Sequence, residues 1–169
     1  MTDALEIYRR RLVSAEEAVR AVRDGDRVVL SSAVEAPTLC WALAARRGEL
    51  RNVRVMVATA RTDFGWYDPA WRESFITEVS FASPLVRDKV NQGLVDYRIE
   101  PAGTSYWKAA DERADADHRT DVYFTEVTPP NEKGFCNFGM HCWDKAANIR
   151  RARVAIAQVN KKLPWIYGD

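Results

Sequence analysis

The sequence has almost no net charge, because 25 lysines and arginines offset 24 aspartates and glutamates to leave a formal charge of +1. A surface that binds nucleic acid or an anionic membrane carries a marked excess of positive charge. The charge balance therefore argues against both partners. Long apolar runs are also missing, and none approaches the ~20 residues that a membrane-spanning helix needs. The first residues lack the apolar segment of a signal peptide.

Cysteine and histidine are scarce, with three cysteines and two histidines in 169 residues. Cys40, Cys136 and Cys142 are odd in number and have no spacing typical of a disulfide framework. We therefore expect reduced thiols and a cytoplasmic location. Cys136, His141 and Cys142 are close in sequence, but their spacing matches no zinc motif, so we predict no metal site.

The common nucleotide-binding and hydrolase motifs are absent as well. No Gly-x-Gly-x-x-Gly follows the first apolar run, which argues against a dinucleotide site. Gly134 and Gly139 are spaced like the glycines of a P-loop, but Met140 and His141 stand where that motif needs Lys and Ser or Thr. Neither Gly-x-Ser-x-Gly nor His-Glu-x-x-His occurs.

What the sequence does contain is an alternation of short apolar runs with helical segments. Strands are expected at 27–30, 52–58, 75–81, 95–99, 122–127 and 154–159. Helices are expected at 15–24, 37–47, 84–92 and 141–151, with a short one at 103–110. Such alternation is typical of a mainly parallel sheet with helices on its faces. The predicted fold class is therefore an open, mainly parallel α/β sheet with helices on both faces, in one domain over residues 1–169.

The most distinctive stretch is residues 128–139, Thr-Pro-Pro-Asn-Glu-Lys-Gly-Phe-Cys-Asn-Phe-Gly, directly after the fifth predicted strand. Prolines remove backbone donors and glycines permit positive φ, so this composition indicates a loop of defined shape. Ligands of open α/β sheets bind beyond the carboxyl ends of the strands. Residues 128–139 and the loop after the first strand, 31–37, are therefore the predicted site. Within the latter, Glu35 either faces a ligand or, the interpretation we favour, is a helix-start carboxylate stabilised by the helix dipole.

Three segments together resemble one known family: residues 13–29, residues 31–44, and residues 128–147 with 159–169. The chain resembles the N-terminal half of the acetyl-CoA hydrolase/transferase family, and more closely its 4-hydroxybutyrate CoA-transferase-like branch, a group of class I CoA-transferases. The element Pro-Pro-x-x-x-Gly-x-x-x-x-Gly, from Pro129 to Gly139, is the most specific part of the resemblance.

The resemblance implies an enzyme of two similar α/β halves with the acyl-CoA site between them. A glutamate attacks the acyl-CoA thioester, and CoA then passes through a glutamyl-CoA thioester to the acceptor acid. Backbone N–H groups stabilise the oxyanions that form in each step. That glutamate belongs to the C-terminal half, so the resemblance implies no catalytic residue in this chain. Coenzyme A is then a substrate, and no permanently bound cofactor or metal is implied.

By the resemblance, this chain supplies loops that shape the substrate and CoA site. The residues concerned are Ser31, Ser32, Ala33, Glu35, Pro37, Pro130, Gly134, Asn137 and Gly139. Many relatives have a glycine pair where Ser31 and Ser32 stand, and place the acid directly before the proline, whereas Ala36 intervenes here. The implied partners are a complementary C-terminal half or β-type subunit, an acyl-CoA and a small carboxylic acid, in an oligomeric assembly.

Several functions fit this resemblance. The expected one is a CoA-transferase that is inactive without its complementary half; with water as the acceptor, the same chemistry gives an acyl-CoA hydrolase. Two non-catalytic alternatives are a ligand-binding module and a scaffold half that only stabilises its partner. The aromatic residues Phe64, Trp66, Tyr67 and Trp71 either line an acyl or pantetheine channel or pack in the core or an interface, and we favour packing.

Overall fold

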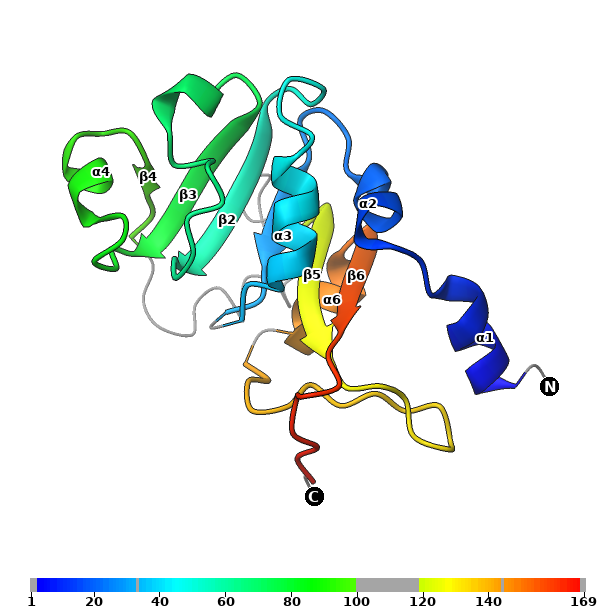
Figure 1. Ribbon diagram of the computed structural model, residues 1–169. Helices are drawn as coiled ribbons and strands as arrows, with labels where there is room; N and C mark the ends of the chain where they lie inside the picture. Colours follow the sequence, from blue (N-terminus) through cyan, green and yellow to red (C-terminus); the bar gives the residue numbers. More distant parts are fainter. Residues whose placement is uncertain (1–2, 33, 100–118, 144, 168–169) are drawn as a thin grey trace.

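The computed structural model describes residues 3–32, 34–99, 119–143 and 145–167 (Figure 1). Its helices are α1 (Ala4–Arg11), α2 (Ala15–Ala18), α3 (Pro37–Ala44), α4 (Arg87–Asn91) and α6 (Lys145–Arg151), with 3₁₀ turns η1 (Val19–Ala21) and η2 (Pro69–Trp71). Its strands are β1 (Arg27–Leu30), β2 (Val53–Thr59), β3 (Phe75–Phe81), β4 (Asp96–Tyr97), β5 (Val122–Val127) and β6 (Val154–Val159).

The strands form one sheet in the order β4-β3-β2-β1-β5-β6, and every neighbouring pair is parallel. The chain builds outward from β1 to β4 and then returns to the other side of β1 to add β5 and β6. Strand order therefore reverses between β1 and β5, where Leu30 lies opposite Phe124. This all-parallel topology confirms the predicted fold class.

Helices cover both faces of the sheet, and alternate strand residues point to each face. On one face, Val28, Val55 and Phe124 join the main core together with Val19 of η1 and Leu43 of α3. On the other face, Val29, Met56 and Tyr123 form a smaller cluster against Ile149 of α6 and the neighbouring Ala152. Figure 1 shows α2 and α3 in front of the sheet and α6 behind it.

The predicted strands at 75–81, 122–127 and 154–159 are confirmed residue for residue, whereas the helices differ at their ends. The segment expected to be one helix at 15–24 is α-helical only in α2 and becomes the 3₁₀ turn η1. The Arg46 guanidinium donates hydrogen bonds there to the backbone carbonyl oxygens of Val19 and Val22, which a longer α-helix would use itself. The helix expected at 141–151 starts only at Lys145. Helix α1 was not predicted, and the 103–110 helix lies outside the described residues. No helix in the described part of the chain is both long and apolar enough to cross a membrane.

Candidate functional site

The carboxyl ends of β1 and β5 meet where the strand order reverses, which is the position at which open α/β sheets bind ligands. The loop 31–36 leaves β1 at this point, and the loop 128–139 leaves β5 beside it. Ser31 begins the first loop, and its N–H group donates to the carbonyl oxygen of Phe124 at 2.9 Å. The two loops predicted from the sequence therefore leave neighbouring strands at the topological switch point.

The two ends of the loop 31–36 are buried, at Ser31 and at Glu35 and Ala36. Ser31 is 3% exposed, and its hydroxyl group has no hydrogen-bond partner among the described residues. Ser32 is half-buried, while the predicted site residue Ala33 lies outside the described residues. Ala36 has a φ of 49°, a left-handed backbone conformation that is uncommon for a residue with a β-carbon. Pro37 follows at the first turn of α3, where its missing N–H group leaves no helical bond unmade.

The Glu35 carboxylate is buried and has a structural partner. Its Oε1 atom accepts the N–H of Arg61 at 2.8 Å, so it ties the loop 31–36 to the segment after β2. The hydrogen bond of the Glu35 carboxylate therefore goes to Arg61 and not to the first turn of α3, whose N-cap residue is Ala36. The Glu35 carbonyl oxygen accepts the Cys40 thiol at 2.7 Å. Burial, reinforced by the Glu35 charge, raises the pKa of the Cys40 thiol well above its ordinary value of 9.0.

A second buried carboxylate, Glu126 near the end of β5, was missed by sequence reasoning. Its two oxygens accept the side-chain amides of Gln158 at 2.7 Å and Asn160 at 3.3 Å. The Gln158 Oε1 atom in turn accepts the N–H of Thr38, in the first turn of α3, at 2.9 Å. This relay fixes α3, and with it the loop 31–36, relative to β5 and β6. Its signal in the sequence is a single charge in the otherwise uncharged strand run 122–127.

The loop 128–139, here called the arm, folds back on itself. The N–H of Thr128 donates to the carbonyl oxygen of Asn137, and the N–H of Asn137 donates to the Thr128 hydroxyl, both at 2.9 Å. The Asn137 side chain holds the C-terminal segment, because its Nδ2 atom donates to the Ile166 carbonyl oxygen at 2.7 Å. Its Oδ1 atom accepts the N–H of Gly139 at 2.8 Å. Asn137 thus uses both ends of its amide group within the chain.

The arm glycines lie in close contacts. Gly134 has a φ of +82°, and a β-carbon there would overlap the Ala4 side chain of α1. Gly139 has a φ of +67°, and a β-carbon there would meet the Leu163 side chain. Figure 1 shows the arm beyond the carboxyl ends of β5 and β6, reaching toward α1. Pro130 is half-buried where the arm leaves the strand.

The predicted site residues therefore fall into two groups. Ser31, Ser32, Glu35 and Pro37 gather at the switch point, whereas Gly134, Asn137 and Gly139 hold the arm against α1 and the C-terminal segment. A further polar anchor is Lys145, which is 1% exposed and donates from Nζ to the Phe138 carbonyl oxygen at 3.0 Å.

The aromatic residues between β2 and β3 are part of the core. Phe64, Trp66 and Tyr67 are each at most 2% exposed, and the ring centroids of Phe64 and Trp66 are 4.9 Å apart. Burial raises the pKa of the Tyr67 hydroxyl, which keeps it neutral. Trp71 is partly buried against this cluster, with the Arg47 guanidinium 4.6 Å from its ring centroid. These contacts fit packing in the core, the role that we favoured from the sequence over the lining of an acyl or pantetheine channel.

Within the described ranges, no group of three His, Cys, Asp or Glu side chains could hold a metal ion.

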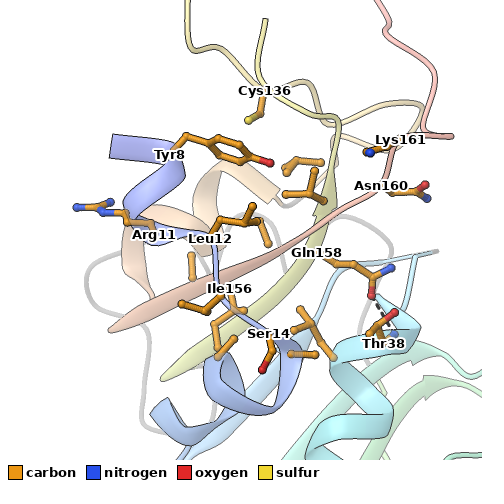
Figure 2. A pocket seen from close by; sticks show the side chains of 18 of the residues that line it. Tyr8, Arg11, Leu12, Ser14, Thr38, Cys136, Ile156, Gln158, Asn160 and Lys161 are labelled. Atoms are coloured by element: carbon orange, nitrogen blue, oxygen red, sulfur yellow. Dashed lines mark hydrogen bonds between the residues drawn. The ribbon is translucent and has the colours of Figure 1, made fainter. Parts of the chain in front are cut away.

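A groove of 880 Å³ lies between α1 and β6 (Figure 2). Tyr8, Leu12 and Cys136 point into it from α1, from the residue after α1 and from the arm.

The model of the Acetyl-CoA hydrolase/transferase N-terminal domain matches residues 2–169. The chain belongs to this family. It is 27% identical to 4-hydroxybutyrate coenzyme A transferase of Clostridium kluyveri over 97% of this chain and 38% of that protein. It is 28% identical to butyryl-CoA:acetate CoA-transferase of Anaerostipes caccae over 96% of this chain and 36% of that protein. The chain thus spans little more than a third of the length of these family members.

Solved structures show the same fold. The 4-hydroxybutyrate CoA-transferase of Porphyromonas gingivalis matches 98% of this chain and 37% of its own, with a TM-score of 0.72 and 26% identity. RipA of Yersinia pestis matches 99% of this chain and 40% of its own, with a TM-score of 0.82 and 23% identity. The second likeness bears on the fold alone.

Proposed function

We propose that this chain is the N-terminal part of a CoA-transferase that moves CoA between an acyl-CoA and a carboxylic acid. The observation that carries the proposal is the extent of the match. Relatives named CoA-transferases align with nearly the whole chain, yet the chain covers only 36–38% of their length. The remainder of the enzyme is then a complementary part that completes the site.

The proposed chemistry is covalent. A glutamate carboxylate of the complementary part attacks the thioester carbonyl carbon, the C–S bond breaks, and the CoA thiolate leaves behind a mixed anhydride. The thiolate then attacks the glutamyl carbonyl carbon, which releases the first carboxylate and forms a glutamyl-CoA thioester. The acceptor carboxylate next attacks the glutamyl-CoA carbonyl carbon and displaces the CoA thiolate, which gives a second mixed anhydride. The thiolate then attacks the acyl carbonyl carbon of the acceptor, so that the acceptor leaves as its CoA thioester and the glutamate is regenerated.

This chain contributes a wall of the site in the proposal, and no nucleophile. Glu35 and Glu126, two carboxylates near the switch point, are both buried and both already accept hydrogen bonds from within the chain. Neither is free to attack a substrate without giving up those bonds. The loop 31–36 and the first residues after β5 border the switch point and are the surfaces that a substrate would meet.

The test is reconstitution. The isolated chain should transfer no CoA from butyryl-CoA to acetate, and adding the C-terminal remainder of the C. kluyveri or A. caccae transferase should produce acetyl-CoA. Acetyl-CoA formation by the isolated chain would overturn the proposal. The family description also covers hydrolases, so free CoA is measured with and without acetate. Release of CoA that does not depend on acetate would indicate the hydrolase instead.

A further inference from the structure

Strand β6 is the last strand of the described sheet, and one of its edges faces the groove. The N–H groups of Val154 and Asn160 donate toward the β5 side at 3.1 and 2.9 Å. Alternate residues of a strand direct their backbone groups to opposite sides. Those of Ala155, Ala157 and Val159 therefore point away from β5, and no described residue pairs with them there. The chain thus presents an open row of donors and acceptors.

The groove along this edge is large enough to accommodate the side chains of a bound peptide segment. Its volume is 880 Å³, and Figure 2 shows Tyr8 and Leu12 on one side with Ile156 of β6 beneath them. Cys136 of the arm closes one end in the same view. An apolar trough beside an unpaired strand edge is the arrangement that binds an extended peptide as an added strand.

The charges around the groove have one sign. Arg11, Lys161 and Lys162 line it, and no aspartate or glutamate does. Within the described residues, none of the three cations forms an ion pair. Like charges gathered at the rim of an apolar trough favour an occupant that carries carboxylates.

We propose that an extended, carboxylate-bearing segment of the complementary part adds to the open edge of β6 and lays its side chains in this groove. The inference rests on the proposed function, which supplies the occupant. The relatives' remaining length, more than half of each protein, is the natural source of such a segment. A bare strand edge favours aggregation, and covering it removes that hazard.

The first experiment follows the Cys136 thiol. In a C142S variant, Cys136 is the exposed thiol of the chain, because Cys40 is buried. Binding of the C-terminal remainder of the C. kluyveri transferase should slow N-ethylmaleimide alkylation of Cys136 by about tenfold, as burial removes reagent access. The matched control is a C136S variant, in which the exposed Cys142 lies outside the groove lining and should keep its rate.

The second experiment removes the strand edge itself. Ala157→Pro deletes an N–H group that points away from β5, so the β5–β6 ladder and the circular dichroism spectrum should persist. Affinity for the same remainder should fall about tenfold. Arg11→Glu should weaken binding as well. Arg10→Glu, also exposed on α1 but outside the groove, should not.

The outcomes separate this inference from the proposed function. Transfer activity with an unprotected Cys136 and a harmless Ala157→Pro substitution would overturn the docking surface alone. Protection without activity would support the surface and count against the transferase. Failure of the remainders to bind would overturn both, and a chain that pairs through β6 with a second copy of itself in sedimentation would overturn the assigned occupant.

Discussion

Asn137 shows how a single side chain can hold two distant segments together. Its amide group bonds Ile166, 29 residues away, as well as Gly139 within the arm. We expect Asn137→Ala to lower the free energy of unfolding by about 0.5–1.5 kcal/mol, because Ile166 and Gly139 lose their hydrogen bonds to this side chain. Urea unfolding measures this change, with Lys133→Ala, an exposed side chain of the same arm, as the neutral control. Unchanged stability combined with lost turnover in the reconstituted enzyme would instead make Asn137 a ligand contact.

Glu78 of β3 carries the densest ionic contacts of the sheet. It pairs with Arg54 at 2.8 Å, Arg27 at 3.1 Å and Arg98 at 3.4 Å. Burial opposes ionisation of Glu78, but the hydrogen bonds and charges of Arg54 and Arg27 outweigh it and lower the pKa of the carboxyl below 4.5. A lowered folded-state pKa means that the ionised form stabilises the fold above 4.5, and that this stabilisation is lost as the pH falls through the folded value.

Glu78→Gln should therefore cost about 3 kcal/mol at neutral pH, since it removes the buried negative charge with which Arg27, Arg54 and Arg98 pair. The difference between wild type and variant should shrink as the pH falls below 4.5, the ordinary glutamate value. Urea unfolding of both proteins at a series of pH values measures it. A difference that stays constant with pH would show that the carboxylate charge does not stabilise the fold.

At the scale of elements, the arm and α1 depend on one close approach at Gly134. Gly134→Ala places a β-carbon against Ala4 and also forces an alanine into a left-handed backbone, so stability should fall by more than the ~1 kcal/mol of backbone strain alone. Gly25→Ala is the matched control, because Gly25 has a φ of +72° and no atom within 4 Å of the added β-carbon.

The contact predicts a specific rescue. Ala4→Gly removes the atom that a β-carbon at position 134 would strike, so the double variant should lose less stability than the sum of the two single variants. Thermal unfolding of the four proteins measures the coupling. Strict additivity would mean that the arm moves away from α1 without cost.

At the scale of the whole molecule, the reversal of strand order between β1 and β5 brings together the two loops of the candidate site. It places the loop 31–36 beside the beginning of the arm, while the relay from Glu126 through Gln158 to Thr38 keeps α3 in register with β5. Both carboxylates near this point serve the fold. The prediction at this scale is that transfer requires the complementary part, as reconstitution with and without the transferase remainders measures.

Much of the fold could be read from neighbours along the chain. The capping sequence from Ser14 to Glu17, the first-turn proline Pro37 and the apolar run 122–127 are local signals, and each forms the predicted element. Helix ends were less predictable, because a side chain from elsewhere decides them. Arg46, 27 residues from Val19, takes the carbonyl that would otherwise extend α2.

The sequence by itself determined the parallel α/β class, the family and the two loops that carry its most specific residues. The tertiary structure decided which residues those loops bring together, because the contacts concerned join positions far apart in the chain. Gln158 meets Thr38 across 120 residues, and Gly134 meets Ala4 although they are 130 residues apart in the sequence (134 − 4). No local pattern of apolar spacing, turns or caps specifies such pairs. They follow from the strand order, which places the first residues after β1 and β5 at the switch point. They follow also from close packing, which brings the arm into contact with α1 at Gly134 and Ala4.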